Sequence, residues 1–342
     1  MQAENRPLRP EQDPSSAPDH LPSLSQKETG AVNPKKGMEY VPDSAGGAAG
    51  NSDKITRAYL DAMLLVYRHI GSVEPNAKTE ILGLACDTPI MASPLSLLDR
   101  IRENGSAEFA KGMARANALT WTGWIDDDAF RRVCDTGARV IRGIKPFQDL
   151  DKIRGAIETA AEAGAAAVFM DIDHCFDDTG RDCPFALGQL SHKTEAELRD
   201  LIGAAKGLPF ILKGILDPAD ARKAKELGAG GVVVSHHHGI WCYSVPPAMM
   251  LPEIREAVGA DYPVYADCGV HSGVDVYKYL ASGANAVGVA RELMTAFGKN
   301  GADGVYDRVM FLTDELLGTM AKTGCATVAE IGGSAIRMRS GW

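Results

Sequence analysis

This 342-residue sequence has no apolar run close to the roughly 20 residues that a membrane-spanning helix needs. It also has no excess of basic residues, because 36 lysines and arginines stand against 45 acidic residues, for a net charge of −9. A nucleic-acid partner, which requires a basic surface, is therefore not expected. The first residues are polar and acidic without the apolar stretch of a signal peptide, so we expect neither export nor a membrane partner.

Paired cysteines are missing as well. The sequence contains seven scattered cysteines, and no two of them have the CxxC spacing of a metal or redox motif. An odd, dispersed set is typical of free thiols in a reducing compartment. We therefore expect a soluble cytoplasmic protein.

Residues 1–52 have little apolar periodicity and are rich in Pro, Ser, Gly and Asn. Such a segment buries too little apolar surface to offset the entropy that is lost on ordering. We expect a disordered or surface-wrapping tail, with an ordered arm packed on a neighbouring subunit as the alternative. Residues 53–342 are expected to form the folded domain, and ITRAYLDAMLLVYRHI (residues 55–70) indicates a helix at its start.

Short runs rich in Val, Ile and Ala then alternate with helical patterns, several of which end at Gly. Eight such units in about 250 residues favour an α/β fold of the (β/α)8 TIM-barrel type. A doubly wound sheet is the rival, but no GxGxxG follows the first run. The eight predicted strands lie in residues 89–94, 118–123, 139–144, 167–173, 209–214, 231–237, 263–269 and 286–291.

Polar residues cluster where the predicted strands end, at the edge where barrels of this kind build their sites. Any one of them is as easily a structural hydrogen bond, but the whole set on one rim favours a ligand site. The most informative pair is Lys213 and His237, which follow consecutive strands. The set comprises Ser93, Ser96, Thr120, Thr122, Arg142, Asp171, Asp173, Lys213, Ser235, His237, Asp267 and Arg291.

Two segments, residues 267–273 and 288–291, favour a phosphate site, because loops after the seventh and eighth strands commonly bind anions. The guanidinium of Arg291 would add a pair of parallel N–H donors there. The run His236–His238 does not favour a metal, since consecutive residues on an extended chain point to alternating sides. We expect proton transfer by His237 and no metal.

Four segments together resemble the FMN-dependent α-hydroxy acid oxidase and dehydrogenase family, of the glycolate oxidase and lactate oxidase type. The resemblance runs from about Thr79 to Ile336, and its motifs are PIMASP (89–94), PFILKGILDPADARKAKELGAGGVVVSHHHG (209–239), PVYADCGVHSGVDVYKYLASGANAVGVAR (263–291) and DELLGTMAKTGCATVAEI (314–331). It implies FMN as cofactor, a homo-oligomer (tetramer or octamer), and oxidation of a 2-hydroxy acid or a related hydroxyl-bearing small molecule. The alternative is an FMN-binding barrel with non-redox, isomerase-like chemistry or with chemistry on another class of compound.

The resemblance also implies roles for individual residues. His237 matches the active-site base, Asp173 the carboxylate that orients this base, and Lys213 the cation that stabilises the reduced flavin. The positions that match or replace cofactor contacts of the family are Pro94, Leu95, Ser96, Thr122, Arg142, Asp171, Lys213, Ser235, Asp267, Cys268, Gly269, His271, Ala290 and Arg291.

The substrate side departs from the family pattern. Ile240 stands in place of an arginine that binds the substrate carboxylate, and Trp241 beside it makes this wall apolar and aromatic. If the substrate is a 2-hydroxy acid, we expect either Arg142 or Arg181 to take over carboxylate binding. These three residues, Arg181, Ile240 and Trp241, are the expected substrate contacts.

Two neighbouring strands depart as well. Arg142 and Ile144 occupy the positions of a glutamine that contacts the flavin and a tyrosine that contacts the substrate, and Asp171 replaces a threonine on the next strand. Because Arg142 and Asp171 lie on adjacent predicted strands, we expect them to form an ion pair beside the flavin ring.

Overall fold

The computed structural model describes residues 50–177, 179–185 and 187–340. The predicted tail therefore lies outside the described residues, except for the short stretch that leads into helix α1 (Ser52–Ala62). The side chain of Asn51 caps this helix by accepting a hydrogen bond from the Lys54 N–H at 3.0 Å. In the described part of the chain, no helix is long and apolar enough to cross a membrane.

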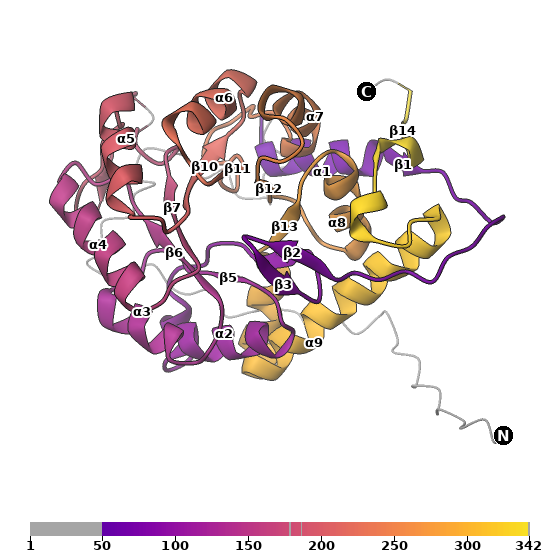
Figure 1. The fold of residues 1–342 in the computed structure, drawn as a ribbon, viewed down its shortest axis with the longest axis horizontal. Helices are drawn as coiled ribbons and strands as arrows, with labels where there is room; N and C mark the ends of the chain where they lie inside the picture. Colours follow the sequence, from indigo (N-terminus) through magenta and orange to yellow (C-terminus); the bar gives the residue numbers. More distant parts are fainter. Residues whose placement is uncertain (1–49, 178, 186, 341–342) are drawn as a thin grey trace. The chain divides into compact units, whose positions relative to one another are not determined.

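Eight parallel strands form one sheet in the order β4-β13-β12-β11-β10-β7-β6-β5. The two ends of this sheet meet through a parallel bridge between Leu95 and Thr122, so the sheet closes into a barrel (Figure 1). Each strand overlaps one of the eight predicted runs, which confirms the (β/α)8 fold. The strands are β4 (Ile90–Ala92), β5 (Thr120–Trp121), β6 (Val140–Ile144), β7 (Ala167–Asp171), β10 (Phe210–Ile215), β11 (Gly231–Val234), β12 (Val264–Ala266) and β13 (Ala286–Val289).

Helices follow the strands and surround the barrel (Figure 1). The ends of α6 (Pro218–Leu227) show how the sequence sets them: Asp217 accepts a hydrogen bond from the Ala219 N–H, and Gly228 takes a left-handed φ of 92°. The other helices are α2 (Gly105–Arg115), α3 (Asp127–Cys134), α4 (Leu150–Glu162), α5 (Glu195–Ala204), α7 (Pro247–Val258), α8 (Gly273–Ala281) and α9 (Arg291–Thr323), with short 3-10 turns η2 (Leu98–Arg100), η3 (Val328–Glu330) and η4 (Gly333–Ala335).

Side chains on the strands point alternately inward and outward, so two apolar layers form, one inside the barrel and one beneath the helices. Trp121, Phe169 and Tyr265 fill the interior, where the rings of Trp121 and Phe169 lie 5.0 Å apart. Burying such a side chain contributes roughly 1.5–3 kcal/mol. Because the interior is filled, a ligand can bind only at an end of the barrel.

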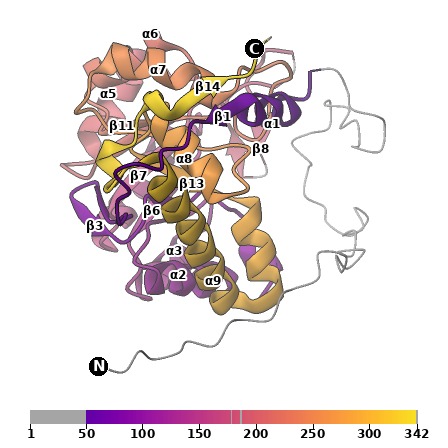
Figure 2. The same cartoon turned by 90° about the vertical axis from the view of Figure 1, so that its right-hand side faces the viewer.

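The predicted helix over residues 55–70 is wrong in its second half. Helix α1 ends at Ala62, and β1 (Met63–Leu65) pairs antiparallel with β14 (Ile336–Met338), as the side view shows (Figure 2). The Val66 N–H extends this pairing by donating to the Ala335 carbonyl at 2.8 Å. A partner strand far along the chain thus overrides the local helical pattern. Two small hairpins complete the fold, β2 (Thr79–Ile81) with β3 (Leu84–Cys86) and β8 (Pro184–Phe185) with β9 (Gly188–Gln189).

Candidate active site

Three groups that the sequence predicts to do chemistry meet at the carboxyl ends of β7, β10 and β11. Lys213 lies opposite Asp171 in the register of β10 and β7, and its Nζ is 3.3 Å from Asp171 Oδ1. His237 follows β11, and its Nδ1 is 3.1 Å from Asp173 Oδ1. The structure thus brings Lys213, His237 and Asp173 together around Asp171.

The backbone around these groups is unusual, and it positions them. His237 has a left-handed φ of 49°, and its N–H donates to Ser235 Oγ at 3.0 Å. The register of β10 shifts between Lys213 and Ile215, where Gly214 has a φ of 101°. A Cβ atom at Gly214 would lie 2.4 Å from Asp173 Cγ. The position of Asp173 therefore depends on glycine at this irregularity.

The ionisable groups of this site shift one another's pKa values. Burial alone would raise the pKa of Asp171, but Lys145, His237 and Lys213 outweigh it and hold that pKa well below its usual range. Burial also opposes ionisation of Asp173, whose pKa is nevertheless lowered by His237. For Lys213, desolvation is outweighed by Asp171 and other carboxylates, so its pKa is raised. At neutral pH Lys213, Asp171 and Asp173 are therefore ionised.

Lys145 belongs to this group, although it was not predicted. It follows β6, is 8% exposed, and places its Nζ 2.7 Å from Asp171 Oδ2 and 3.1 Å from His174 Nδ1. Burial, and then the charge of Lys145, lower the pKa of His174 to about 4. The period of two along β6 could have revealed Lys145, because Ile141 faces the barrel interior and every second residue after it faces the same way.

The predicted pairing of Arg142 with Asp171 is wrong. Arg142 points away from the barrel interior, where it forms an ion pair with Asp127, donates to the Ala156 carbonyl at 2.9 Å and lies over the Phe130 ring. Its neighbour Ile144 also packs in the outer layer. The reason is the strand pleat, which turns these residues toward the helices and turns Lys145 toward the site. Arg142 is therefore not placed to contact a cofactor or a substrate carboxylate.

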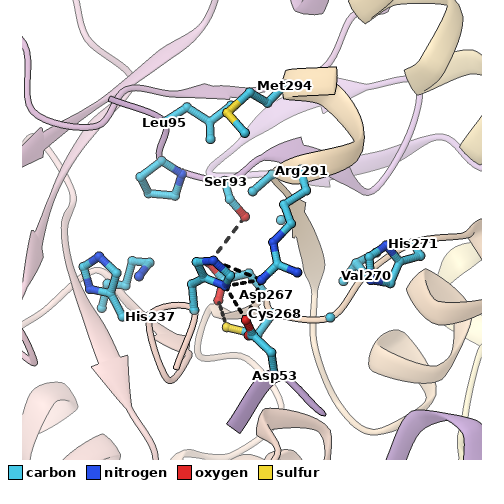
Figure 3. Close-up of a pocket in the computed structure, with 16 residues that line it drawn as sticks. Asp53, Ser93, Leu95, His237, Asp267, Cys268, Val270, His271, Arg291 and Met294 are labelled. Carbon is cyan, nitrogen blue, oxygen red and sulfur yellow. Dashed lines mark hydrogen bonds and ion pairs between the residues drawn. The ribbon is translucent and has the colours of Figure 1, made fainter. Parts of the chain in front are cut away.

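A pocket of about 380 Å³ extends from Lys213 and His237 to Arg291 (Figure 3). It lies between the ends of β4, β12 and β13, and its glycines and alanine leave room for a ligand to approach the backbone. Asp53, His238, Val270 and Met294 line it without having been predicted. The predicted cofactor contacts that line it are Pro94, Leu95, Lys213, Asp267, Cys268, Gly269, His271, Ala290 and Arg291.

An acidic side chain sits at the phosphate end of this pocket. Asp53, from α1, forms an ion pair with Arg291 (Figure 3) and contacts His238, whose Nδ1 is 2.6 Å from Asp53 Oδ2. Burial opposes ionisation of Asp53, but a hydrogen bond from His238 and the charge of Arg291 lower its pKa. No local pattern in the sequence indicates this contact, because α1 and Arg291 are far apart along the chain.

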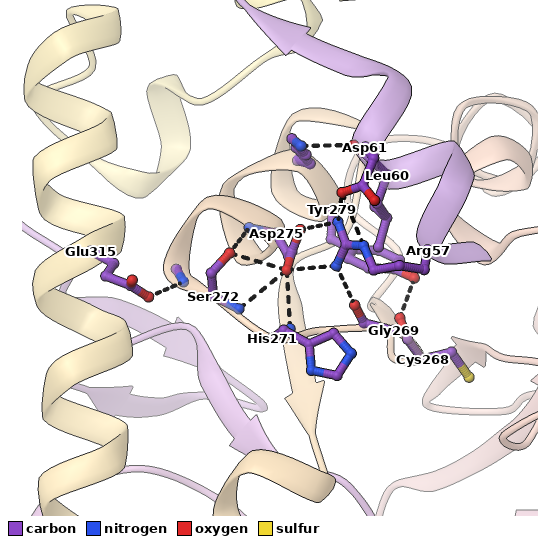
Figure 4. A network of polar contacts seen from close by, with 12 residues as sticks. Arg57, Leu60, Asp61, Cys268, Gly269, His271, Ser272, Asp275, Tyr279 and Glu315 are labelled. Carbon is purple, nitrogen blue, oxygen red and sulfur yellow. Dashed lines mark hydrogen bonds and ion pairs between the residues drawn. The ribbon is translucent and has the colours of Figure 1, made fainter. Parts of the chain in front are cut away.

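Helix α1 is fixed to the pocket by a network around Arg57 (Figure 4). The guanidinium donates to both carboxylate oxygens of Asp275, at 2.8 and 2.9 Å, and to the Gly269 carbonyl at 2.9 Å. Thr56 contacts His236 Nε2 at 2.8 Å, so the first histidine of the run supports α1 and does not line the pocket. Helix α1 and the loop before α8, which are distant in sequence, thus form one wall of the pocket.

Several predicted residues do not line this pocket. Ser96 accepts a hydrogen bond from the Trp124 N–H, and Thr122 accepts one from the Gly143 N–H, so both support nearby backbone. Arg181 is exposed in the loop between β7 and β8. The pocket lining also omits Asp171, Asp173, Ser235, Ile240 and Trp241.

The residues present fit FMN better than a metal. Asp171, Asp173 and His237 offer ligand atoms within 4.8 Å of one another, but Lys145 and Lys213 already neutralise Asp171 and would repel a cation. An anionic phosphate suits the opposite end, where Arg291 and the loop before α8 line the pocket. Lys213 would lie beside the electron-rich ring.

Comparison with known proteins agrees with this assignment. The chain is 31% identical to an L-lactate oxidase of a Roseobacter species over 75% of its own length and 78% of that enzyme. It is 43% identical to an L-lactate oxidase of Alicycliphilus denitrificans, over 40% of this chain and 37% of that enzyme. A solved mandelate oxidase variant with a monooxide FMN adduct superposes with a TM-score of 0.78 and 27% identity, covering 86% of this chain and 95% of that one. The sequence pattern of the FMN-dependent dehydrogenases matches residues 31–183 and 184–338, and the chain belongs to that family.

Proposed function

We propose that this FMN-dependent oxidoreductase oxidises a small hydroxyl-bearing molecule, a 2-hydroxy acid or a related compound, with His237 as the base. The observation that carries the proposal is the His237–Asp173 contact beside Lys213, at the end of a pocket lined by predicted FMN contacts. Relatives named L-lactate oxidase and solved neighbours named mandelate oxidase support the substrate class.

Each side chain has a defined part in this reaction. FMN, when bound, would supply the acceptor for the hydrogen and the two electrons that leave the hydroxyl-bearing carbon of the substrate as a hydride. His237 Nδ1–H donates to Asp173, which leaves Nε2 free to take the proton of the substrate hydroxyl. Asp173 stabilises the imidazolium that results, and the Lys213 ammonium stabilises negative charge on the cofactor ring. Arg291 and the loop containing Gly269 would hold the phosphate.

The role of His237 is tested by the variant His237→Ala. It should retain FMN but lose reduction of the flavin by substrate by about 10²–10⁴-fold, the usual contribution of a positioned base. The measurement is anaerobic stopped-flow bleaching of bound FMN by lactate, glycolate, mandelate and neutral 2-hydroxy compounds. The exposed residue His192 supplies the control, His192→Ala, which should behave as the wild type. A rate in His237→Ala equal to that of the wild type would refute the role of the base.

We also propose that the protein is a homo-oligomer, a tetramer or octamer, and that it works in the cytoplasm. The oligomer rests on the resemblance to the family. The location rests on the seven cysteines, which are odd in number, scattered and without CxxC spacing. Sedimentation of the FMN-loaded chain measures the oligomeric state, and a monomer at micromolar concentration would contradict the proposed tetramer or octamer.

A further inference from the structure

The buried charges next to His237 sum to zero. Lys145 and Lys213 place their Nζ atoms 2.7 and 3.3 Å from the two oxygens of Asp171, and Asp173 contacts His237 at 3.1 Å. His174 adds no charge at neutral pH, because burial and then Lys145 lower its pKa to about 4. A substrate carboxylate would therefore find no net positive charge in this part of the site.

The arginines that could have replaced the carboxylate-binding arginine, whose position Ile240 occupies, make other contacts. Arg142 is paired with Asp127 beneath the helices, and Arg181 is exposed in a loop. Ile240 has no donor, and Arg291 lies at the phosphate end, where Asp53 binds it. Among the described residues, Lys145 is thus the cation nearest His174 and Asp171 on the substrate side, and Asp171 already neutralises it.

The carboxylates beside His237 also disfavour an anion. Asp171 Oδ1 is held by the Lys213 ammonium at 3.3 Å, and Asp173 Oδ2 is buried without a hydrogen bond to any described residue. A substrate carboxylate, which only accepts hydrogen bonds, would add a third negative charge next to these two. An uncharged group adds no such charge.

An aromatic cluster continues from the charged group. The His174 ring lies 5.3 Å from the His237 ring and 6.4 Å from the Phe185 ring. Phe185 in turn lies 6.3 Å from Trp124 and 6.0 Å from Phe147. These rings offer an apolar surface to a substrate side group, and they favour an aryl-bearing probe.

We infer that the site selects an uncharged 2-hydroxy compound, such as an amide, over the corresponding carboxylate, and that Asp171 determines this specificity. The inference rests on the proposed function, because it concerns the substrate of the same site. Asp171 acts by neutralising Lys145, which would otherwise attract an anion.

A pair of probes that differ only in a carboxamide or a carboxylate group tests the inference. They are 2-oxo-2-phenylacetamide and 2-oxo-2-phenylacetate, whose carbonyl carbon is already oxidised, so binding is measured without turnover. Each is titrated into the FMN-loaded full-length protein, and the flavin absorbance change gives its Kd. The amide should bind about tenfold more tightly or better, which corresponds to about 1.4 kcal/mol. Tighter or equal binding of the carboxylate, or no spectral change with either probe, would overturn the inference.

Variants locate the effect. Asp171→Asn frees the charge of Lys145 and should move the ratio of the two Kd values about tenfold toward the carboxylate. The exposed pair Asp200–Arg154 provides the control Asp200→Asn, which should leave the ratio unchanged. If Asp171→Asn does not retain FMN, Lys145→Met takes its place, and it should move the ratio the opposite way. An unchanged ratio in the folded variant refutes the role of Asp171.

The outcome is separable from that of the proposed function. If no 2-hydroxy compound bleaches the flavin, the proposed oxidation fails, while the two Kd values still report whether the wall selects against an anion. If bleaching occurs but the carboxylate binds better, the oxidation stands and the selection fails.

Discussion

At the residue scale, Asp53 is the side chain that most affects how the protein would hold its cofactor. Its carboxylate occupies the space beside Arg291, and a phosphate at that end of the pocket would compete with it for the same guanidinium. Anion binding there therefore requires Arg291 to exchange partners or to bind both. The other ring side chains at this end are His238 and His271, which are 61% and 43% exposed.

The variant Asp53→Asn should bind FMN more tightly. Removing the competing charge is worth about 1 kcal/mol at this partly exposed position, or about fivefold in Kd. Quenching of FMN fluorescence on titration with apoprotein gives the Kd, and Asp61→Asn on the exposed face of α1 is the control. Weaker binding in Asp53→Asn would mean that Asp53 supports the loop instead of competing with phosphate.

Individual site residues were predictable where a strand ends and not elsewhere. Lys213, His237 and Asp173 follow strands whose order places their ends on one rim, so their proximity followed from the pattern. The assignment of Arg142 was wrong because residue 142 lies on the outward side of the strand pleat, whereas Lys145, three residues later, points inward. Asp53 could not be predicted, because its place depends on the packing of α1 against a loop distant in sequence.

At the scale of elements, α1 is held against the barrel mainly by Arg57. The Arg57 side chain is 28% exposed, and its guanidinium makes charge-assisted hydrogen bonds to Asp275 and to the Gly269 carbonyl at the pocket edge. The capping box of α8 uses the same Asp275, which accepts a hydrogen bond from the Ser272 N–H. Loss of Arg57 would therefore loosen both α1 and the loop before α8.

Arg57→Ala should lower the free energy of unfolding by about 2–3 kcal/mol, because a partly buried carboxylate loses its partner. It should also weaken FMN binding, since Gly269 lines the pocket. Urea unfolding measures the first effect, with Arg154→Ala, an exposed arginine paired with Asp151 and Asp200, as the control. Equal loss in both variants would contradict a special role for the α1 contact.

Elements of the barrel were predictable because each buried parallel strand is a continuous apolar run between helix stops. The pattern could not locate the end of α1, since MLLVY continues a helical periodicity that β14 overrides. The same limit applies to the hairpins β2–β3 and β8–β9, whose strands are too short to show alternation.

At the scale of the whole molecule, the buried ionisable groups predict how stability depends on pH. The pKa of His174 is lowered to about 4 in the folded state, so the unfolded chain binds the extra proton first as the pH falls. This contribution to stability is present above the usual pKa of histidine, about 6.5, and is lost toward pH 4. The carboxylates with lowered pKa values, Asp171, Asp173 and Asp275, act in the same direction at lower pH.

Between pH 7.5 and pH 5, His174 alone should remove about 2 kcal/mol of unfolding free energy. The variant His174→Gln should show a correspondingly smaller loss over this interval, whatever its stability at pH 7.5. Urea unfolding at both pH values measures the difference, and His192→Gln, with an exposed ring, should keep the wild-type dependence. An identical loss in His174→Gln would show that its ring protonates in the folded state.

During synthesis, β1 cannot pair until β14 has been made. Met63 in β1, the strand that follows α1, lies opposite Met338 in β14. Strand β1 therefore has no partner until all strands of the barrel have been translated. At about 5–20 residues per second, this interval lasts tens of seconds. Until then β1, which contains the exposed Leu64, presents an unpaired strand edge that other chains could bind. The pairing of β1 with β14 is therefore among the last contacts that a newly made chain can form.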